Sequence, residues 1–163
     1  DVNMKQAKQI YVLVTAILLC SLLFLPSSHV HAFAAKATTA KTNPPPVLVT
    51  PFSIFDPCFE YLSEGESTIL DNGDQTARIN VSTIAKTTVS SIGATIYLEK
   101  WTGSQWIEVS SKALNASNRM LFSGYAEFNI TSGYYYRART THWTSQDGVY
   151  EHGESITSSI LAI

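Results

Sequence analysis

The residues best suited to chemistry in this chain are aromatic. The stretch EKWTGSQW, residues 99–106, places two tryptophans on either side of a four-residue loop, so a hairpin there would set Trp101 opposite Trp106. Alternation along a strand then puts Tyr97 on the same face. Exposed aromatic rings with hydrogen-bonding neighbours suit a sugar-binding surface, and an exposed apolar patch generally marks an interaction site. The alternative is a tryptophan pair that only clips the hairpin or covers the edge of the core.

The same hairpin sets Glu99 opposite Glu108, and like charges placed directly opposite are destabilising. Three outcomes are open: a different register, a nearby arginine or lysine, or a bound cation. Two glutamates are too few oxygen ligands to predict a metal site. Counting further from the loop pairs Leu98 with Val109. Because Leu98 is expected in the core, Val109 and Ile107 are predicted to face the core as well.

A second aromatic stretch, SGYYYRARTTHW, occupies residues 132–143. Alternation sends Tyr136 and Ala138 to one face and Arg137 and Arg139 to the other. A face with two arginines is wet, so the Tyr136 face belongs to the core. The arginines are secondary candidates for ligand binding beside the aromatic residues of the hairpin. The predicted binding residues are therefore Tyr97, Trp101, Trp106, Arg137 and Arg139.

Tyr136 also fits a structural motif, the tyrosine corner of Greek-key sandwiches, whose hydroxyl bonds back to the chain entering the strand. In fibronectin type III domains a large aliphatic residue is followed by Pro-Gly and then by tyrosine. Ile130, Gly133 and Tyr136 have the corresponding spacing here, with Ser132 in place of the proline. These residues are predicted to be architectural.

Acidic and histidine residues gather near the C-terminus, where Asp147-Gly148 indicates a hairpin turn. Solvated turn residues explain this group better than a zinc site, which needs converging ligands. The chain has no G-x-S-x-G elbow. Paired carboxylates of a small secreted hydrolase remain an alternative, because their separation is spatial. We predict no catalytic residue, metal or cofactor. The group consists of His142, Asp147, Glu151, His152 and Glu154.

The N-terminus resembles a secretory signal peptide over residues 1–32, including three residues before Met4. Its apolar run, residues 10–25, is short for a bilayer that needs about 20 residues, which disfavours the alternative of a membrane anchor. Small residues allow cleavage after Ala32 or Ala34. We therefore expect a secreted protein with no membrane association after cleavage.

The chain left by cleavage after Ala32 has 9 Lys+Arg (11 minus two) against 12 Asp+Glu (13 minus one). A mildly acidic chain without a basic block argues against nucleic acid as a partner. Cys58 is then the only cysteine, a free thiol. Because several phenylalanines flank it, burial is the favoured interpretation, with an intermolecular bridge or a reactive group as alternatives.

Three regions follow from the composition. Residues 1–32 are the signal peptide, 33–50 an Ala/Thr/Pro spacer predicted to be disordered, and 51–163 a folded domain. The domain shows six to eight short segments of alternating apolar and polar residues separated by turn residues, and no sustained helical spacing. This pattern predicts an all-β fold, a single antiparallel β-sandwich of the immunoglobulin or fibronectin type III kind with Greek-key connections. Prolines within 47–62 favour an edge strand there.

The segments EGESTILDNG, IAKTTVSSIGATIYLEKWTGSQW and GYYYRARTTHW, with the closing SITSSILAI, resemble a domain of unknown function in small exported proteins of Gram-positive bacteria. The resemblance covers roughly residues 55–163. It implies export, a bacterial source and a β fold, and it supplies no functional residues. We expect a non-catalytic extracellular binding or structural module for a surface glycan or an exported protein. The alternatives are a self-associating structural protein and a small hydrolase.

Overall fold

The computed structural model describes residues 38–47 and 52–163, so the predicted signal peptide lies outside the described residues. The described chain contains seven strands and no helix. It therefore holds no helix capable of crossing a membrane. The strands are β1 (Phe52–Ile54), β2 (Leu62–Asp71), β3 (Thr76–Trp101), β4 (Trp106–Asn129), β5 (Tyr135–Gln146), β6 (Val149–Ile156) and β7 (Ile160–Leu161).

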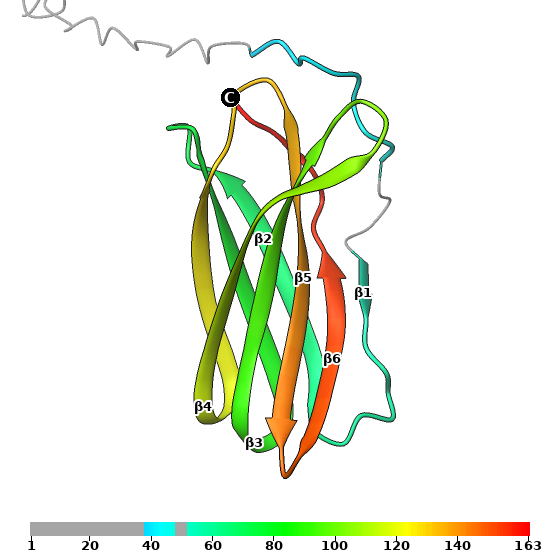
Figure 1. Cartoon of the computed structure of the whole chain (residues 1–163), viewed down its shortest axis with the longest axis vertical. Helices are drawn as coiled ribbons and strands as arrows, with labels where there is room; N and C mark the ends of the chain where they lie inside the picture. The colour runs from blue at the N-terminus through cyan, green and yellow to red at the C-terminus, as the bar shows by residue number, and fades with distance from the viewer. Residues whose placement is uncertain (1–37, 48–51) are drawn as a thin grey trace, which may run out of the picture. The chain divides into compact units, whose positions relative to one another are not determined.

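The long strand β3 organises the sheet (Figure 1). One of its edges pairs with β4 along almost the whole length, with an interruption at residues 85–88. Its other edge pairs first with β2, over 77–85, and then with β5, over 91–100. Strand β5 continues the sheet to β6 and then to β1, and it also pairs with β7. All of these pairings are antiparallel.

The alternation of side chains in β3 changes phase at the interruption. Before it the odd-numbered residues are buried, as at Ile79 and Val81, and after it the even-numbered ones, as at Ile96 and Leu98. The sheet curls there, so that its two halves face each other. Two contacts show this: Thr83 Oγ1 donates to the carbonyl of Gly93, 3.2 Å away, and Lys112 Nζ donates to the carbonyl of Glu127 within the same strand.

The core lies between the facing halves. It contains Ile69, Ile79, Ile92, Ile96, Leu98, Phe128 and Tyr136 among others. The predicted tyrosine corner is present: Tyr136 is buried, and its hydroxyl accepts a hydrogen bond of 3.0 Å from the N–H of Thr131. Ile130 is buried beside it, and Gly133 has a positive φ of 87°. The corner fixes how the chain enters β5, and therefore to which face of the sheet Arg137 and Arg139 point.

The all-β antiparallel prediction is confirmed. The segments expected as separate strands within 76–101 and within 106–129 are joined into β3 and β4. The tight turn at Asp147-Gly148 is present, with φ of 50° and 83°, as is the four-residue loop 102–105. The two-sheet arrangement of immunoglobulin or fibronectin type III domains stays a prediction.

Three residues expected to be buried are exposed. Val109 and Ile107 were placed in the core, yet they are 44% and 38% exposed. A bulge at Leu98/Glu99 pairs Leu98 with Ser110 and leaves Val109 out of the register. Cys58 is exposed, because its loop turns outward where Asp56 accepts the N–H of Cys58 at 2.8 Å.

Residues 38–47, within the segment expected to be a flexible spacer, lie against the sheet. We call them the strap. The N–H of Lys41 donates to the carbonyl of Gly133 at 2.8 Å, and the carbonyl of Asn43 accepts a hydrogen bond of 3.0 Å from the indole of Trp101. This part of the segment is therefore docked.

Candidate functional site

The structure brings all five predicted binding residues to one side of the sheet, the outer face of β4, β3, β5 and β6. Odd-numbered residues of β5 and of the second half of β3 point to this face, with Glu99 opposite Arg137 and Tyr97 opposite Arg139. Trp101 pairs with Trp106 of β4 as the sequence predicted. The register Glu99–Glu108 is also confirmed.

Arg137 and Arg139 compensate the charge of the facing glutamates. Glu99 accepts from Nε of Arg137 at 2.7 Å and from Nε of Arg139 at 3.0 Å. Arg139 also lies 3.6 Å from Glu108 and 3.4 Å from Glu154. Of the three outcomes considered, nearby arginines are the one observed. Burial alone would lower the pKa of Arg139, but Glu99 raises it above its usual value.

Each arginine also covers an aromatic ring. The guanidinium of Arg137 lies 4.5 Å from the ring centre of Trp106, and that of Arg139 lies 4.3 Å from the ring centre of Tyr97. Such stacking is an attractive cation–π contact. The arginines are thus held by carboxylates at the guanidinium edge and by rings at its face, which gives this part of the outer face a fixed shape.

Trp101 departs from the expectation of an exposed tryptophan pair. Only 7% of its surface is exposed, because the strap passes over it and takes its indole hydrogen bond. Its ring lies 5.3 Å from that of Trp106, which stays partly exposed. The pair therefore clips the hairpin, which was the alternative interpretation, and it also supports the strap.

Sequence reasoning missed Trp143 and Tyr150 on the same face, and it placed His152, which also lies there, among the solvated turn residues. The alternation that selects Arg137 and Arg139 continues along β5 to Trp143, so extending it would have found this residue. Gly93 of β3 lies opposite Trp143, and the indole occupies the space that a side chain at 93 would need. Trp143 stacks with Tyr150 at 6.0 Å between ring centres, and Tyr150 with His152 at 5.8 Å.

These residues extend the site toward the β5–β6 turn. Tyr150 is 58% exposed. The pKa of Tyr150 is raised by its partial burial and by the neighbouring Tyr97. We call the whole set the outer row. It consists of Trp106, Arg137, Glu99, Arg139, Tyr97, Trp143, Tyr150 and His152.

The acidic and histidine residues near the C-terminus do not converge. In the described part of the chain no three His, Cys, Asp or Glu side chains are grouped to hold a metal ion. Glu151 is buried, which corrects its assignment as a solvated turn residue. Its carboxylate accepts the backbone N–H groups of Glu60, Tyr61 and Leu62 at 2.5–2.8 Å. Burial acts to raise the pKa of Glu151, but these N–H groups bring it below its usual value.

His142 is also fully buried, which corrects its place among the solvated turn residues, and it links four strands through hydrogen bonds. Its Nδ1 lies 2.8 Å from Thr83 Oγ1, and its Nε2 lies 2.8 Å from Ser155 Oγ. Ser155 in turn lies 2.9 Å from Ser67 Oγ. Because the Thr83 hydroxyl donates to a backbone carbonyl, we assign the proton of the neutral imidazole to Nδ1. A histidine next to a serine is a catalytic pattern, but both side chains are buried here and the network is closed by hydroxyls, so we interpret it as structural.

No family model matches this chain, and the curated proteins contain no match to it. The resemblance to an exported Gram-positive family therefore stays a prediction.

Replacing Glu99 by glutamine should destabilise the domain by about 2 kcal/mol, because two partly buried guanidinium groups lose their shared carboxylate. The expected loss is below the value for a fully buried pair, since Arg139 keeps Glu108 and Glu154. Urea unfolding at pH 7 measures it. Glu127→Gln is the matched control, since it removes an ion pair with Arg78 that is exposed on both sides, and its effect should lie near the error of measurement. Equal losses in the two variants would contradict the role assigned to Glu99.

His142 makes stability depend on pH. Burial lowers its pKa from 6.5 to about 4, so below pH 6.5 the unfolded chain binds a proton that the folded chain does not. Stability contributed by the neutral imidazole is complete above pH 6.5 and is lost as the pH falls toward 4, by up to about 3 kcal/mol. Urea unfolding between pH 7 and 4 should show this slope, and His142→Gln should flatten it. An NMR titration that places the pKa of His142 near 6.5 would refute the assignment.

Proposed function

We propose that this protein is an exported, non-catalytic binding module whose outer row holds an extended polymer at the cell surface, most directly a polysaccharide. The observation that carries the proposal is the alignment of Trp106, Tyr97 and Trp143 with two fixed arginines on one face. From Arg137 to Trp143 the row extends over six residue-to-residue steps of β5, or roughly 20 Å at 3.3–3.4 Å per step. That length suits a ligand made of several units.

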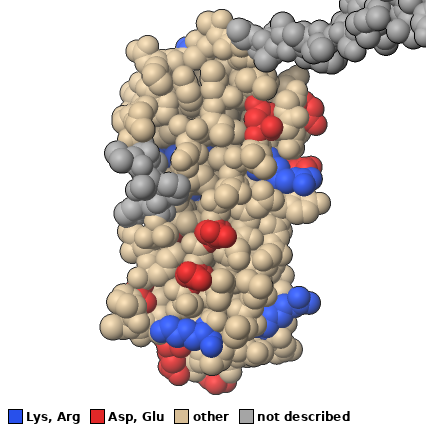
Figure 2. Space-filling model, turned by 180° about the vertical axis from the view of Figure 1, so that it is seen from behind, with Lys and Arg blue, Asp and Glu red and all other residues tan. Residues whose placement is uncertain are grey.

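The chemistry of the row fits a carbohydrate. The exposed ring of Tyr150 and the parts of the other rings that the arginines leave uncovered offer apolar contact with the C–H faces of sugars, while guanidinium and carboxylate groups supply donors and acceptors for hydroxyls. Most of these groups are already held by neighbours on the same face, so little side-chain entropy is lost when a ligand binds. The opposite face of the molecule, seen in Figure 2, carries its charged side chains in small groups separated by wide uncharged surface, without a basic block.

The finer fold assignment belongs to the same proposal. The curled sheet with facing halves and the tyrosine corner at Tyr136 support a sandwich of the fibronectin type III or immunoglobulin kind. Such domains serve as extracellular modules. The predicted signal peptide with cleavage after Ala32 or Ala34, together with the resemblance to exported Gram-positive proteins, supports the proposal of a secreted bacterial protein.

Self-association is a second candidate function, favoured by the free edge of β4. In the described part of the chain β4 pairs only with β3 over its 24 residues. Several apolar residues are exposed along it, including Val109, Met120 and Leu121. An unpaired edge offers N–H and C=O groups to a strand of another copy.

Retention on insoluble cell-wall polysaccharide tests the binding proposal. Trp143→Ala combined with Tyr97→Ala should weaken retention at least tenfold, or about 1.4 kcal/mol, with an unchanged circular dichroism spectrum. Tyr125→Ala is the control, because Tyr125 is an exposed tyrosine that lies outside the outer row, in the second half of β4. Retention of the double variant at the level of the control would exclude the outer row as the binding surface.

Sedimentation over a range of protein concentrations tests self-association, with reductant present so that a Cys58 bridge does not contribute. If β4 pairs between copies, Val109→Lys should shift the association to at least tenfold higher concentration, since a charge at a sheet edge opposes pairing. Val149→Lys, which adds the same charge at the β5–β6 turn, should leave association unchanged. A monomer at all concentrations would rule out this second candidate.

A further inference from the structure

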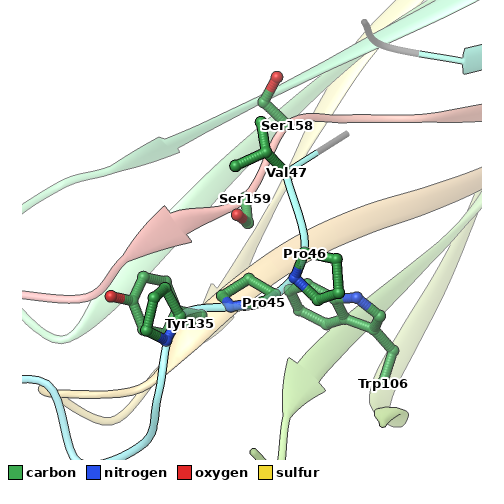
Figure 3. A pocket seen from close by; sticks show the side chains of 8 residues that line it. Pro45, Pro46, Val47, Trp106, Tyr135, Ser158 and Ser159 are labelled. Atoms are coloured by element: carbon green, nitrogen blue, oxygen red, sulfur yellow. The ribbon is translucent and has the colours of Figure 1, made fainter. Parts of the chain in front are cut away.

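A groove lies where the strap crosses the sheet, at one end of the outer row. It has a volume of about 240 Å³ and lies between the strap and the domain (Figure 3). From the strap come Pro44, Pro45, Pro46 and Val47, and from the domain come Trp106, Tyr135, Ser158 and Ser159. Figure 3 shows Pro45 between the ring of Tyr135 and the indole of Trp106, with Pro46 at the Trp106 end.

The middle proline enters the groove most deeply. Pro45 is buried, whereas Pro44, Pro46 and Val47 are exposed. Consecutive prolines favour the polyproline II conformation, which has three residues per turn and leaves its carbonyl groups without internal partners. Because the turn is this short, one proline in the run faces the protein while its neighbours face solvent, as observed here.

The domain supplies the two elements that recognise such a chain. The first is a wall of aromatic rings, Trp106 and Tyr135, of which Trp106 is fixed between Trp101 at 5.3 Å and the guanidinium of Arg137 at 4.5 Å. The second is a donor for a free carbonyl, the indole N–H of Trp101, which binds the carbonyl of Asn43 at 3.0 Å. Aromatic-lined grooves with a hydrogen-bond donor are a recurring way of binding proline-rich peptides.

We propose that this groove is a binding site for proline-rich peptides in the polyproline II conformation, and that Asn43–Pro46 of the strap is its internal ligand. The inference goes beyond the proposed polysaccharide function and does not depend on it. A tethered ligand acts at an effective concentration of about millimolar. Residues 43–46 therefore keep the groove closed to weak external ligands until the strap is displaced.

The anchors of the strap explain why it stays in place. Besides the hydrogen bond from Lys41 to Gly133, the ammonium group of Lys41 lies 4.9 Å from the ring centre of Tyr134. These contacts lie on the N-terminal side of the prolines and do not involve the groove. Removal of the prolines alone should therefore empty the groove without removing the anchors.

The test uses the full chain with Pro44→Gly, Pro45→Gly and Pro46→Gly together, and a capped synthetic peptide of residues 41–47, KTNPPPV, as the probe. Glycine removes the preference for polyproline II from the strap. Calorimetric titration should show the peptide binding this variant at least tenfold more tightly than the unaltered protein. Tryptophan fluorescence of the variant should shift to longer wavelength in the free state and return on peptide binding.

Three controls make the result specific. The peptide KTNPAPV, which lacks the proline equivalent to Pro45, should bind at least fivefold more weakly. Adding Trp106→Ala to the strap variant should abolish binding, and adding Tyr125→Ala should not. If the triple variant does not fold, the single variant Pro45→Gly is titrated in its place with the same peptides.

The proposal is overturned if a folded strap variant does not bind KTNPPPV, or if it binds KTNPAPV equally well. It is also overturned if Trp106→Ala leaves the affinity unchanged. Loss of polysaccharide retention in the outer-row variants bears on the other proposal alone, because those variants keep Trp106, Tyr135 and the prolines.

Discussion

The phase change in β3 is the constraint on which the arrangement of this protein depends. A strand of 26 residues cannot keep one face buried and remain straight in a domain of this size, so the sheet must curl. The extra residues at 85–88 let it do so, and after them the other set of side chains faces the core. As a result Tyr97, Glu99 and Trp101 lie outside, on the same face as the arginines of β5. If the odd-numbered residues had stayed buried after the interruption, these three residues would lie in the core, and Ile96 and Leu98 would be exposed.

The facing halves of the curled sheet are joined by polar as well as apolar contacts. The imidazole of His142 connects β3, β5 and β6, and through Ser155 the network reaches β2. Buried polar groups are costly unless their hydrogen bonds are made, and here each ring nitrogen has a partner. Gly65 of β2 lies against the ring, where a Cβ atom would come within 2.3 Å of it. The network therefore fixes how closely the two halves approach, which apolar packing alone leaves adjustable.

Local features of this fold could be predicted from the sequence. The loop 102–105, the Asp147-Gly148 turn and the corner at Tyr136 each depend on residues a few positions apart, and each is present. Alternation along the strand likewise predicted the face on which Arg137 and Arg139 lie. The bulge at Leu98/Glu99 could not be predicted, because one inserted residue changes no local propensity. The burial of Trp101 depends on Asn43, 58 positions away, and apolar neighbours in sequence did not indicate that the loop of Cys58 turns outward.

The arrangement around Arg139 limits what the outer row can attract at a distance. Glu99, Glu108 and Glu154 all lie within 4 Å of its guanidinium, and Glu99 is shared with Arg137. Three carboxylates thus accompany two guanidinium groups, and the positive field of the arginines is cancelled within a few ångströms, less than the Debye length of about 8 Å at physiological ionic strength. A polyanion that approaches this face meets no net electrostatic attraction. An uncharged polymer does not depend on such attraction, so its binding is not weakened. Association through this face should therefore be almost indifferent to added salt, in contrast to the steep salt dependence of sites built from unpaired basic side chains.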